Sequence, residues 1–137
     1  MFIHDGFTPS LQQIEDYCQV ADAAWNDGAI AVHCRAGLGR TGTMIASFLI
    51  RRFSLDALHV IAFLRLMRAG MILSVQGDFL VSIQYLLRGE DTPEPIAEHL
   101  KTRYSIDVDS YRNTDDDEFS TSHEDIVIDI TTKVKVK

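Results

Sequence analysis

The stretch from Ile30 to Thr43 constrains the fold more than any other part of the chain. A short apolar run leads into Cys34, a loop with two glycines follows, and an apolar helical pattern begins directly at Arg40. A loop that opens a helix directs free backbone N–H groups and the positive end of the helix dipole into one small space, which suits a phosphate. The order strand, loop, helix predicts an α/β fold with helices packed on a sheet.

Cys34 and Arg40 have the properties needed for covalent chemistry on a bound phosphoryl group. The thiol lies in the positive field of the loop, so we expect its pKa to fall and the thiolate to act as nucleophile. Arg40 offers a planar fork of donors to two phosphoryl oxygens. Thr41 offers a hydroxyl toward the sulfur, which eases its departure from an intermediate. The predicted phosphate-binding loop consists of Arg35, Ala36, Gly37, Leu38, Gly39 and Arg40.

Other interpretations of this loop are weaker. Gly37–Gly42 also matches the dinucleotide pattern G-x-G-x-x-G, but the acidic residue expected about 20 positions later, Asp56, falls in a helical pattern. An ATP-binding P-loop is excluded because no Gly-Lys-Ser/Thr is present. A purely structural turn with an inert cysteine would explain neither the glycines nor the position of the arginine.

The remaining pattern predicts helices around one incomplete sheet. We expect a fragment of strand at 1–3, a buried strand at 29–33 and helices at about 9–26, 40–53, 55–67 and 76–87. Thr8 is the expected N-cap of the first helix, Ser54 that of the third, and Gly70 the cap that ends the third. A stable sheet usually needs three or more strands, and the first ninety residues supply one and a fragment.

Composition divides the chain near residue 89. The net charge is −7, and residues 91–137 carry twelve acidic and six basic side chains against eight and seven in residues 1–90. We therefore expect a catalytic part at 1–89 and a mostly disordered, acidic, low-complexity tail at 90–137. Within the tail, 126–130 and 133–137 have the alternation or apolar character of short strands.

Several functional classes are disfavoured by the sequence. No apolar run is long enough to cross a membrane, and no signal peptide begins the chain. No basic face indicates nucleic-acid binding, and the histidines and cysteines lack metal-ligand spacing, so we expect neither metal nor cofactor. With only Cys18 and Cys34, a reducing cytoplasmic or nuclear setting is expected. Cys18 falls on an apolar helical face and is interpreted as packing, with a disulfide partner for Cys34 as the alternative.

The loop resembles a known signature. His33-Cys34, five further residues and Arg40-Thr41 resemble the signature of cysteine-dependent protein tyrosine and dual-specificity phosphatases. The longer stretch 29–43 looks like the mitotic-exit group, the cell-division-cycle fourteen type, which reverses phosphorylation by cyclin-dependent kinases. Residues 5–10, Asp-Gly-Phe-Thr-Pro-Ser, are similar to the general-acid loop of that group, and the resemblance extends over about residues 3–88.

The resemblance implies roles for further residues. Asp5 takes the place of the general acid, with an ordinary loop aspartate as the alternative. Gln76 takes the place of a glutamine that positions water, with an exposed residue near a helix start as the alternative. Gly77 and Asp78 depart from the glutamines that the family has there. His33 is expected to turn away from the pocket and to order the loop by hydrogen bonds.

The loop residues also bear on the substrate. Phosphatases of this type that act on inositide phosphates usually carry lysine at the positions of Arg35 and Leu38, and here only one of the two is basic. The resemblance therefore favours a phosphoprotein substrate, hydrolysed at phosphoserine, phosphothreonine or phosphotyrosine through a phosphocysteine.

Most of the family's sheet precedes the general-acid loop, so the resemblance implies a partial protein-tyrosine-phosphatase-like fold, truncated at the N-terminus. The tail strands or a partner would then supply the missing sheet. The alternative function is a catalytically impaired phosphatase that acts as a phosphate-binding or regulatory module.

Overall fold

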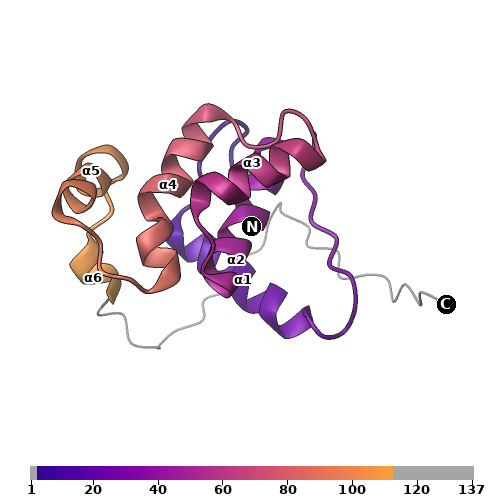
Figure 1. Ribbon diagram of the computed structural model, residues 1–137, viewed down its shortest axis with the longest axis horizontal. Helices are drawn as coiled ribbons and strands as arrows, with labels where there is room; N and C mark the ends of the chain where they lie inside the picture. The colour runs from indigo at the N-terminus through magenta and orange to yellow at the C-terminus, as the bar shows by residue number, and fades with distance from the viewer. Residues whose placement is uncertain (1–2, 113–137) are drawn as a thin grey trace.

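The computed structural model describes residues 3–112, and this part of the chain is helical (Figure 1). No strand forms within it. The helices are α1 (Leu11–Ala24), α2 (Gly39–Phe53), α3 (Ala57–Met67), α4 (Ser74–Arg88), α5 (Glu94–Tyr104) and α6 (Val108–Arg112).

Helix α2 is the centre of the fold, because α1, α3 and α4 all pack against it. Its buried face carries apolar side chains such as Met44 and Ile50. Two hydroxyl residues, Thr43 and Ser47, are also fully buried there. Thr43 donates to the Gly39 carbonyl and Ser47 to the Thr43 carbonyl, each over 2.9 Å. Both buried hydroxyl groups are therefore satisfied within the helix itself.

The predicted sheet is wrong for the described residues. Residues 29–34 are not helical, and Ile30 and Val32 pack half-buried against the core while Ala31 and His33 are exposed. This alternation is typical of a strand, but no other described segment pairs with it. A strand requires a neighbour to receive its backbone hydrogen bonds, and helices cover the core here instead. The predicted partner that would complete a sheet stays a prediction.

The first and third helices begin later than predicted. Ser10, not Thr8, caps α1: its hydroxyl accepts from the Gln13 N–H, and the Gln13 side chain accepts from the Ser10 N–H. This reciprocal capping box satisfies two donors at once, which a cap at Thr8 would not do. Asp56, not Ser54, caps α3 by accepting from two backbone N–H groups of its first turn. Ser54 instead ends α2 in the left-handed conformation, with φ of 51°.

Part of the predicted tail is folded. The expectation of a mostly disordered segment from residue 90 is wrong for α5 and α6, which lie within it. Leu100 of α5 is fully buried, and the Tyr104 ring meets the Phe79 ring of α4 edge-on at 5.2 Å between centroids. The signal for α5 was present as Ile96, Leu100 and Tyr104, spaced four apart. The acidic run at 115–118 and the predicted tail strands lie outside the described residues.

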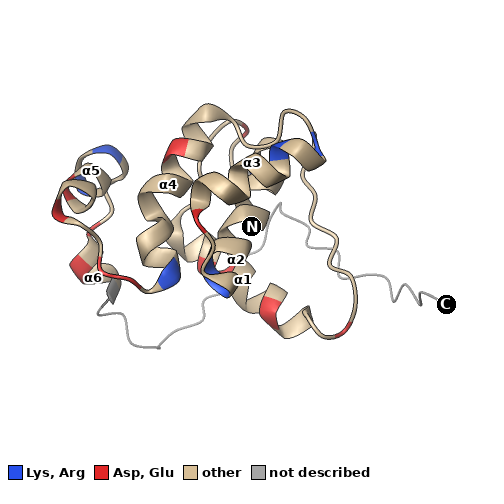
Figure 2. Cartoon of the chain, viewed as in Figure 1, with Lys and Arg blue, Asp and Glu red and all other residues tan. Residues whose placement is uncertain are grey.

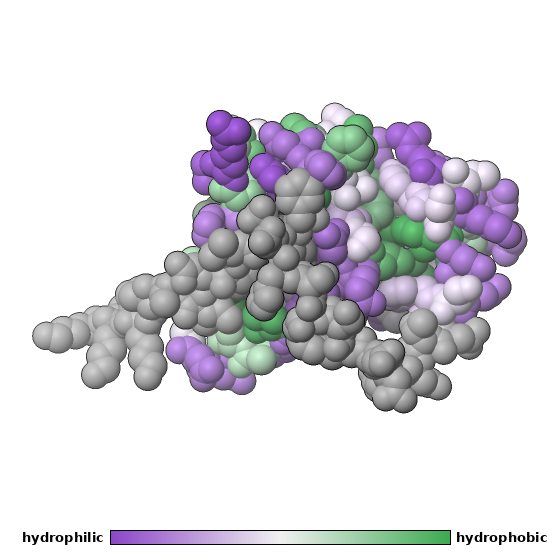
Figure 3. Space-filling view, turned by 180° about the vertical axis from the view of Figure 1, so that it is seen from behind, coloured by the Kyte–Doolittle hydropathy of each residue, from purple (hydrophilic) through white to green (hydrophobic). Residues whose placement is uncertain are grey.

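The surface of α3 is unusually apolar for an outer helix. Leu58, Phe63, Leu66 and Met67 are all more than half exposed. Seen from behind the view of Figure 1, the visible described residues show apolar patches separated by polar side chains (Figure 3). Basic residues gather at the C-terminal end of α3 (Figure 2). Among the described helices, none combines the length and apolar character that a membrane span requires.

Two buried glycines should respond oppositely to alanine. A Cβ on Gly42 of α2 would lie 2.8 Å from Ile72 Cγ1 and 3.3 Å from the Ile72 nitrogen, whereas a Cβ on Gly77 of α4 meets only ordinary contacts at 3.8 Å. We expect Gly42→Ala to lower the free energy of unfolding by about 1–3 kcal/mol through overpacking. Gly77→Ala should raise it by up to about 1 kcal/mol, because alanine restricts the unfolded chain. Urea titration of both variants checks this, and a change of the same sign in both would contradict it.

Candidate active site

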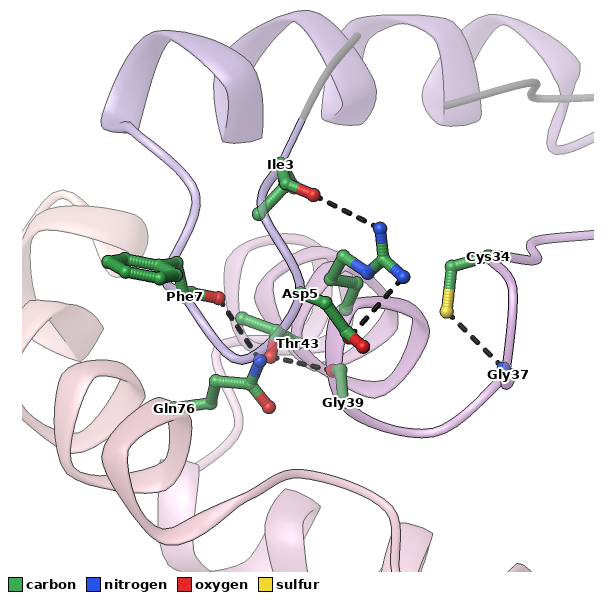
Figure 4. A network of polar contacts seen from close by, with 9 residues as sticks. Ile3, Asp5, Phe7, Cys34, Gly37, Gly39, Thr43 and Gln76 are labelled. Carbon is green, nitrogen blue, oxygen red and sulfur yellow. Dashed lines mark hydrogen bonds and ion pairs between the residues drawn. The ribbon is translucent and has the colours of Figure 1, made fainter. Parts of the chain in front are cut away.

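The loop from Cys34 to Gly39 closes tightly around the cysteine sulfur. Gly37 has φ of 68°, a left-handed conformation that glycine adopts without strain. Its N–H points at the Cys34 Sγ over 3.3 Å (Figure 4). The loop then enters α2 at Gly39, and Leu38 at the N-cap position makes no side-chain cap. The N–H groups of the first turn therefore have no side-chain cap and are available to an anion.

The environment of Cys34 favours its thiolate. Burial raises the pKa of the thiol, but hydrogen bonding from the Thr41 side chain and from backbone N–H groups of Thr41, Gly37 and Ala36 outweighs it. Together these effects lower the pKa of Cys34 from its ordinary value of 9.0 to about 7. This is the direction that the sequence predicts. Close to half of the cysteine is then thiolate at neutral pH, and the thiolate is the nucleophilic form.

Thr41 lies beside the sulfur at the start of α2. Its side chain is buried, and its hydroxyl oxygen has no hydrogen-bond partner of ordinary geometry among the described residues. The hydroxyl nevertheless acts on Cys34, since it is the largest of the influences that lower the thiol pKa. A buried hydroxyl without a settled partner is free to follow the charge on the sulfur.

Arg40 joins the N-terminal segment to the loop. Its side chain is 13% exposed, and its guanidinium donates from Nη1 to the Ile3 carbonyl over 3.1 Å. Nη2 lies 3.3 Å from Asp5 Oδ1 (Figure 4). Nε is buried with no hydrogen-bond partner in residues 3–112. A buried N–H without an acceptor carries a free-energy penalty. An anion that accepts a hydrogen bond from Nε would remove this penalty.

Asp5 reaches the same site from the other end of the sequence. It lies in a turn before α1, and its side chain is 84% exposed apart from the ion pair with Arg40. The structure therefore brings Asp5 to Arg40, although thirty-five positions separate them, and Figure 4 shows Asp5 and Cys34 in the same region around the start of α2. An exposed carboxyl at the edge of a phosphate-binding loop can reach a leaving oxygen above it.

Gln76 is fully buried at the start of α4, which excludes the alternative of an exposed residue near a helix start. Its Nε2 donates to the Phe7 carbonyl over 3.1 Å, and its Oε1 accepts from the Leu73 N–H over 3.0 Å. The amide therefore lies between the Asp5 turn and α4. Neither hydrogen bond of Gln76 reaches the sulfur of Cys34, so its water-positioning role stays a prediction.

Three other predicted residues lie around the loop without converging on the sulfur. Arg35 is exposed and Leu38 is half-buried against the core. His33 is exposed as well, and its side chain makes no hydrogen bond within the described part of the chain. The hydrogen bonds by which His33 was expected to order the loop are therefore not made in this structure. Cys18, by contrast, is fully buried, and burial raises the pKa of its thiol to about 12.

One residue near the loop was missed by sequence reasoning. Arg68, which follows α3, donates from Nη2 to the Ala36 carbonyl over 3.3 Å. Its guanidinium also covers Gly37, where a Cβ would lie 3.1 Å from Arg68 Nη1. The signal available in the sequence was the pair Arg65 and Arg68, three apart at the end of a helix. The pair does not by itself indicate a functional site, because basic residues are common at helix C-termini.

Two cavities of the described part of the chain lie away from the Cys34 loop. Two adjoining cavities of about 330 and 340 Å³ open near the C-terminal end of α4 and are both lined by Leu86, Gly89 and Tyr111. Neither includes a residue of the Cys34 loop. The candidate active site is built from backbone N–H groups of the loop and from the Arg40 guanidinium, donors that suit a phosphoryl group.

Comparisons with known proteins agree with this geometry. A family profile described as "Polymorphic toxin system, DSP-PTPase phosphatase" matches residues 1–54. The mouse "Dual specificity protein phosphatase CDC14B" is 33% identical over 132 residues, covering 86% of this chain and 27% of that protein. The human "Dual specificity protein phosphatase CDC14C" is 40% identical over 84 residues, covering 61% of this chain and 18% of that protein.

A third relative is the "Tyrosine-protein phosphatase CDC14 homolog" of Schizosaccharomyces pombe, 41% identical over 80 residues, or 58% of this chain and 15% of that protein. The chain thus spans between 15% and 27% of the length of these three relatives. The matched part of the chain is homologous to the cysteine-dependent dual-specificity phosphatases, and the CDC14 group is among its relatives.

Proposed function

We propose that this chain is a protein phosphatase that hydrolyses phosphate monoesters of serine, threonine and tyrosine through a phosphocysteine at Cys34. The observation that carries the proposal is the meeting of a thiol whose pKa is lowered to about 7 with Arg40 and Asp5 at the uncapped start of α2. The names of the relatives, which are tyrosine and dual-specificity phosphatases, support the same reaction class.

In the first proposed step, the Cys34 thiolate attacks phosphorus, an S–P bond forms and the P–O bond to the substrate breaks. Asp5 gives its proton to the departing oxygen, so the substrate leaves as an alcohol or phenol. Arg40 and the loop N–H groups bind the equatorial oxygens and stabilise the charge they carry in the transition state. For this, Arg40 exchanges its contact with Asp5 for the phosphoryl group, whose oxygens can also satisfy its buried Nε.

In the second step, water attacks the phosphocysteine and the S–P bond breaks. Asp5, now a carboxylate, takes a proton from the water, and inorganic phosphate is released. The sulfur leaves as a thiolate, which the Thr41 hydroxyl and the Gly37 N–H stabilise. The same groups that lower the pKa of Cys34 therefore also make it a good leaving group.

The proposed catalytic part is residues 1–89, and its substrate is a phosphoprotein. Two relatives are named as dual specificity protein phosphatases, which supports a phosphorylated protein side chain as the substrate. A reactive thiol with this pKa is kept free most easily in a reducing compartment, so we place the protein in the cytoplasm or nucleus.

A second candidate function is a phosphate-binding module without turnover. The observation that favours it is the engagement of Arg40 by Asp5 and the Ile3 carbonyl, with the Asp5 side chain 84% exposed. If Asp5 cannot be held over the leaving oxygen, the loop would bind oxyanions and react slowly. Vanadate binding, measured by calorimetry, in the absence of Cys34-dependent hydrolysis would select this candidate.

Removing the two reacting groups should have different consequences. We expect Cys34→Ser to abolish hydrolysis of p-nitrophenyl phosphate. Asp5→Asn should slow hydrolysis of a phosphotyrosine peptide about 100-fold, and that of p-nitrophenyl phosphate much less, because nitrophenolate leaves without a proton. Asp27→Asn, at an exposed aspartate before the loop, is the matched control. Turnover that survives in Cys34→Ser would overturn the proposal.

The pH dependence of alkylation should report the Cys34 thiolate. The thiolate fraction rises with pH through the pKa, so the rate of iodoacetamide labelling should have its midpoint near pH 7. Thr41→Val removes a group that favours the thiolate and should move the midpoint up by about one pH unit. Thr43→Val, whose hydroxyl bonds the Gly39 carbonyl, is the control on the same helix. Buried Cys18 should stay unlabelled, and an unshifted midpoint in Thr41→Val would contradict the assignment.

A further inference from the structure

Gln76 lies at a junction of three segments of the molecule. Its side chain is completely buried, and its amide donates to the Phe7 carbonyl while accepting from the Leu73 N–H (Figure 4). Phe7 is two residues from Asp5 and sixty-nine from Gln76. One side chain therefore connects the turn that carries Asp5 to the start of α4.

The same amide lies against the first residue of α2. A Cβ on Gly39 would lie 2.8 Å from Gln76 Oε1 and 3.0 Å from Nε2. The amide thus occupies the space in which any larger residue at position 39 would place its side chain. Because Gly39 ends the phosphate-binding loop, Gln76 fixes the Asp5 turn relative to that loop and not only relative to α4.

Asp5 needs such a support. Within its turn, the Phe7 N–H donates to the His4 carbonyl, which closes the turn but does not anchor it. From outside, Arg40 holds the segment at the Ile3 carbonyl and at the Asp5 carboxyl. Arg40 is the residue that the proposed mechanism turns toward phosphate, so its hold on Asp5 is lost when the acid is needed. The bond from Gln76 to the Phe7 carbonyl does not depend on that exchange.

We propose that Gln76 is a positioning residue for the proton donor Asp5, and that it acts on formation of the phosphocysteine and not on its hydrolysis. This inference rests on the proposed function of the site. A water-positioning role requires an amide that a water molecule can reach, and the side chain of Gln76 has no exposed surface. Turning the amide outward toward a water would break the part-buried bond to the Leu73 N–H or the one to the Phe7 carbonyl.

The chain offers a matched control in Gln84, a second buried glutamine on α4. Gln84 accepts from the Ala57 N–H over 3.2 Å and donates to the Val81 carbonyl over 3.0 Å, so it joins α4 to the start of α3. Methionine at either position keeps the length of the side chain and removes its polar ends. Both changes disturb buried amides, but only Gln76→Met releases the Asp5 turn.

The experiment resolves the two chemical steps by rapid quench. With a phosphotyrosine peptide, we expect Gln76→Met to slow formation of the phosphocysteine about 10- to 100-fold, and Gln84→Met about twofold or less. With p-nitrophenyl phosphate, Gln76→Met should change the burst rate little. In an Asp5→Asn background the same substitution should have almost no further effect, because the group it positions is gone.

Gln76→Glu provides a variant of nearly the same shape in case the methionine variant does not fold. Its carboxylate still accepts from the Leu73 N–H but has no hydrogen to donate to the Phe7 carbonyl. We expect the same preferential loss on the phosphotyrosine peptide. Any effect of the new charge on Cys34 would instead slow both substrates equally, and the ratio of the two rates separates these causes.

Three results would overturn the inference. They are a normal burst followed by slow hydrolysis in Gln76→Met, an equal loss in Gln84→Met, and a loss that persists undiminished in the Asp5→Asn background. Failure of the proposed function would look different, since the wild-type chain would then show no Cys34-dependent burst on p-nitrophenyl phosphate. A wild-type burst together with any of the three results rejects the role of Gln76 alone.

Discussion

The position of the first turn of α2 is the constraint on which the site depends. This turn has no side-chain cap, so its N–H groups and the loop before it face a common point next to Cys34. The rest of α2 is packed against α1, α3 and α4, which prevents the turn from shifting. The core of the fold therefore holds in place donors that would otherwise be satisfied by a cap or by water. Binding an anion there requires little reorganisation, which is the basis of electrostatic catalysis.

Arg40 adds a second constraint that couples the two ends of the site. Without an anion, its guanidinium is paired with Asp5 and the Ile3 carbonyl, and its buried Nε has no hydrogen-bond partner among the described residues. In the proposed mechanism, a phosphoryl group displaces the Asp5 carboxylate from Arg40 and frees it to act on the leaving oxygen. The ion pair is thus an arrangement of the resting state, and the turn around Asp5 needs support that does not come from Arg40. The buried amide of Gln76 lies where such support is needed.

The sequence predicted the helices well where each had an apolar face and a signal at its ends. Helices α1, α2, α3 and α4 all lie within a few residues of their predicted positions. Errors occurred where two polar residues competed for one cap, as with Thr8 against Ser10 and Ser54 against Asp56. Such competition is settled by which side chain reaches an N–H group in the folded backbone. Helix α5 was missed because proline and acidic residues around it obscured a regular spacing of Ile96, Leu100 and Tyr104.

The sheet is the main disagreement between sequence and structure. Residues 29–33 alternate in burial as a strand does, but a strand is defined by its neighbour, and no local pattern says whether one is present. Similarly, the sequence placed Gln76 near the site through a resemblance, yet left open whether its amide faced solvent or the interior. The position of Arg68 beside the loop could not be predicted from the sequence, because its bond to the Ala36 carbonyl joins segments thirty-two residues apart.

The sequence by itself determined the chemistry of the loop. Cys34, the glycines and Arg40 are close along the chain, and the helix that follows them is recognisable from its own residues. Local sequence is therefore enough to predict a thiol within an anion-binding loop. Only the tertiary structure decided what surrounds that loop. The ion pair of Arg40 with Asp5, the burial of Gln76 and the replacement of a sheet by packed helices all depend on contacts between distant segments. Such contacts follow from how whole elements share one core, which no short stretch of sequence specifies.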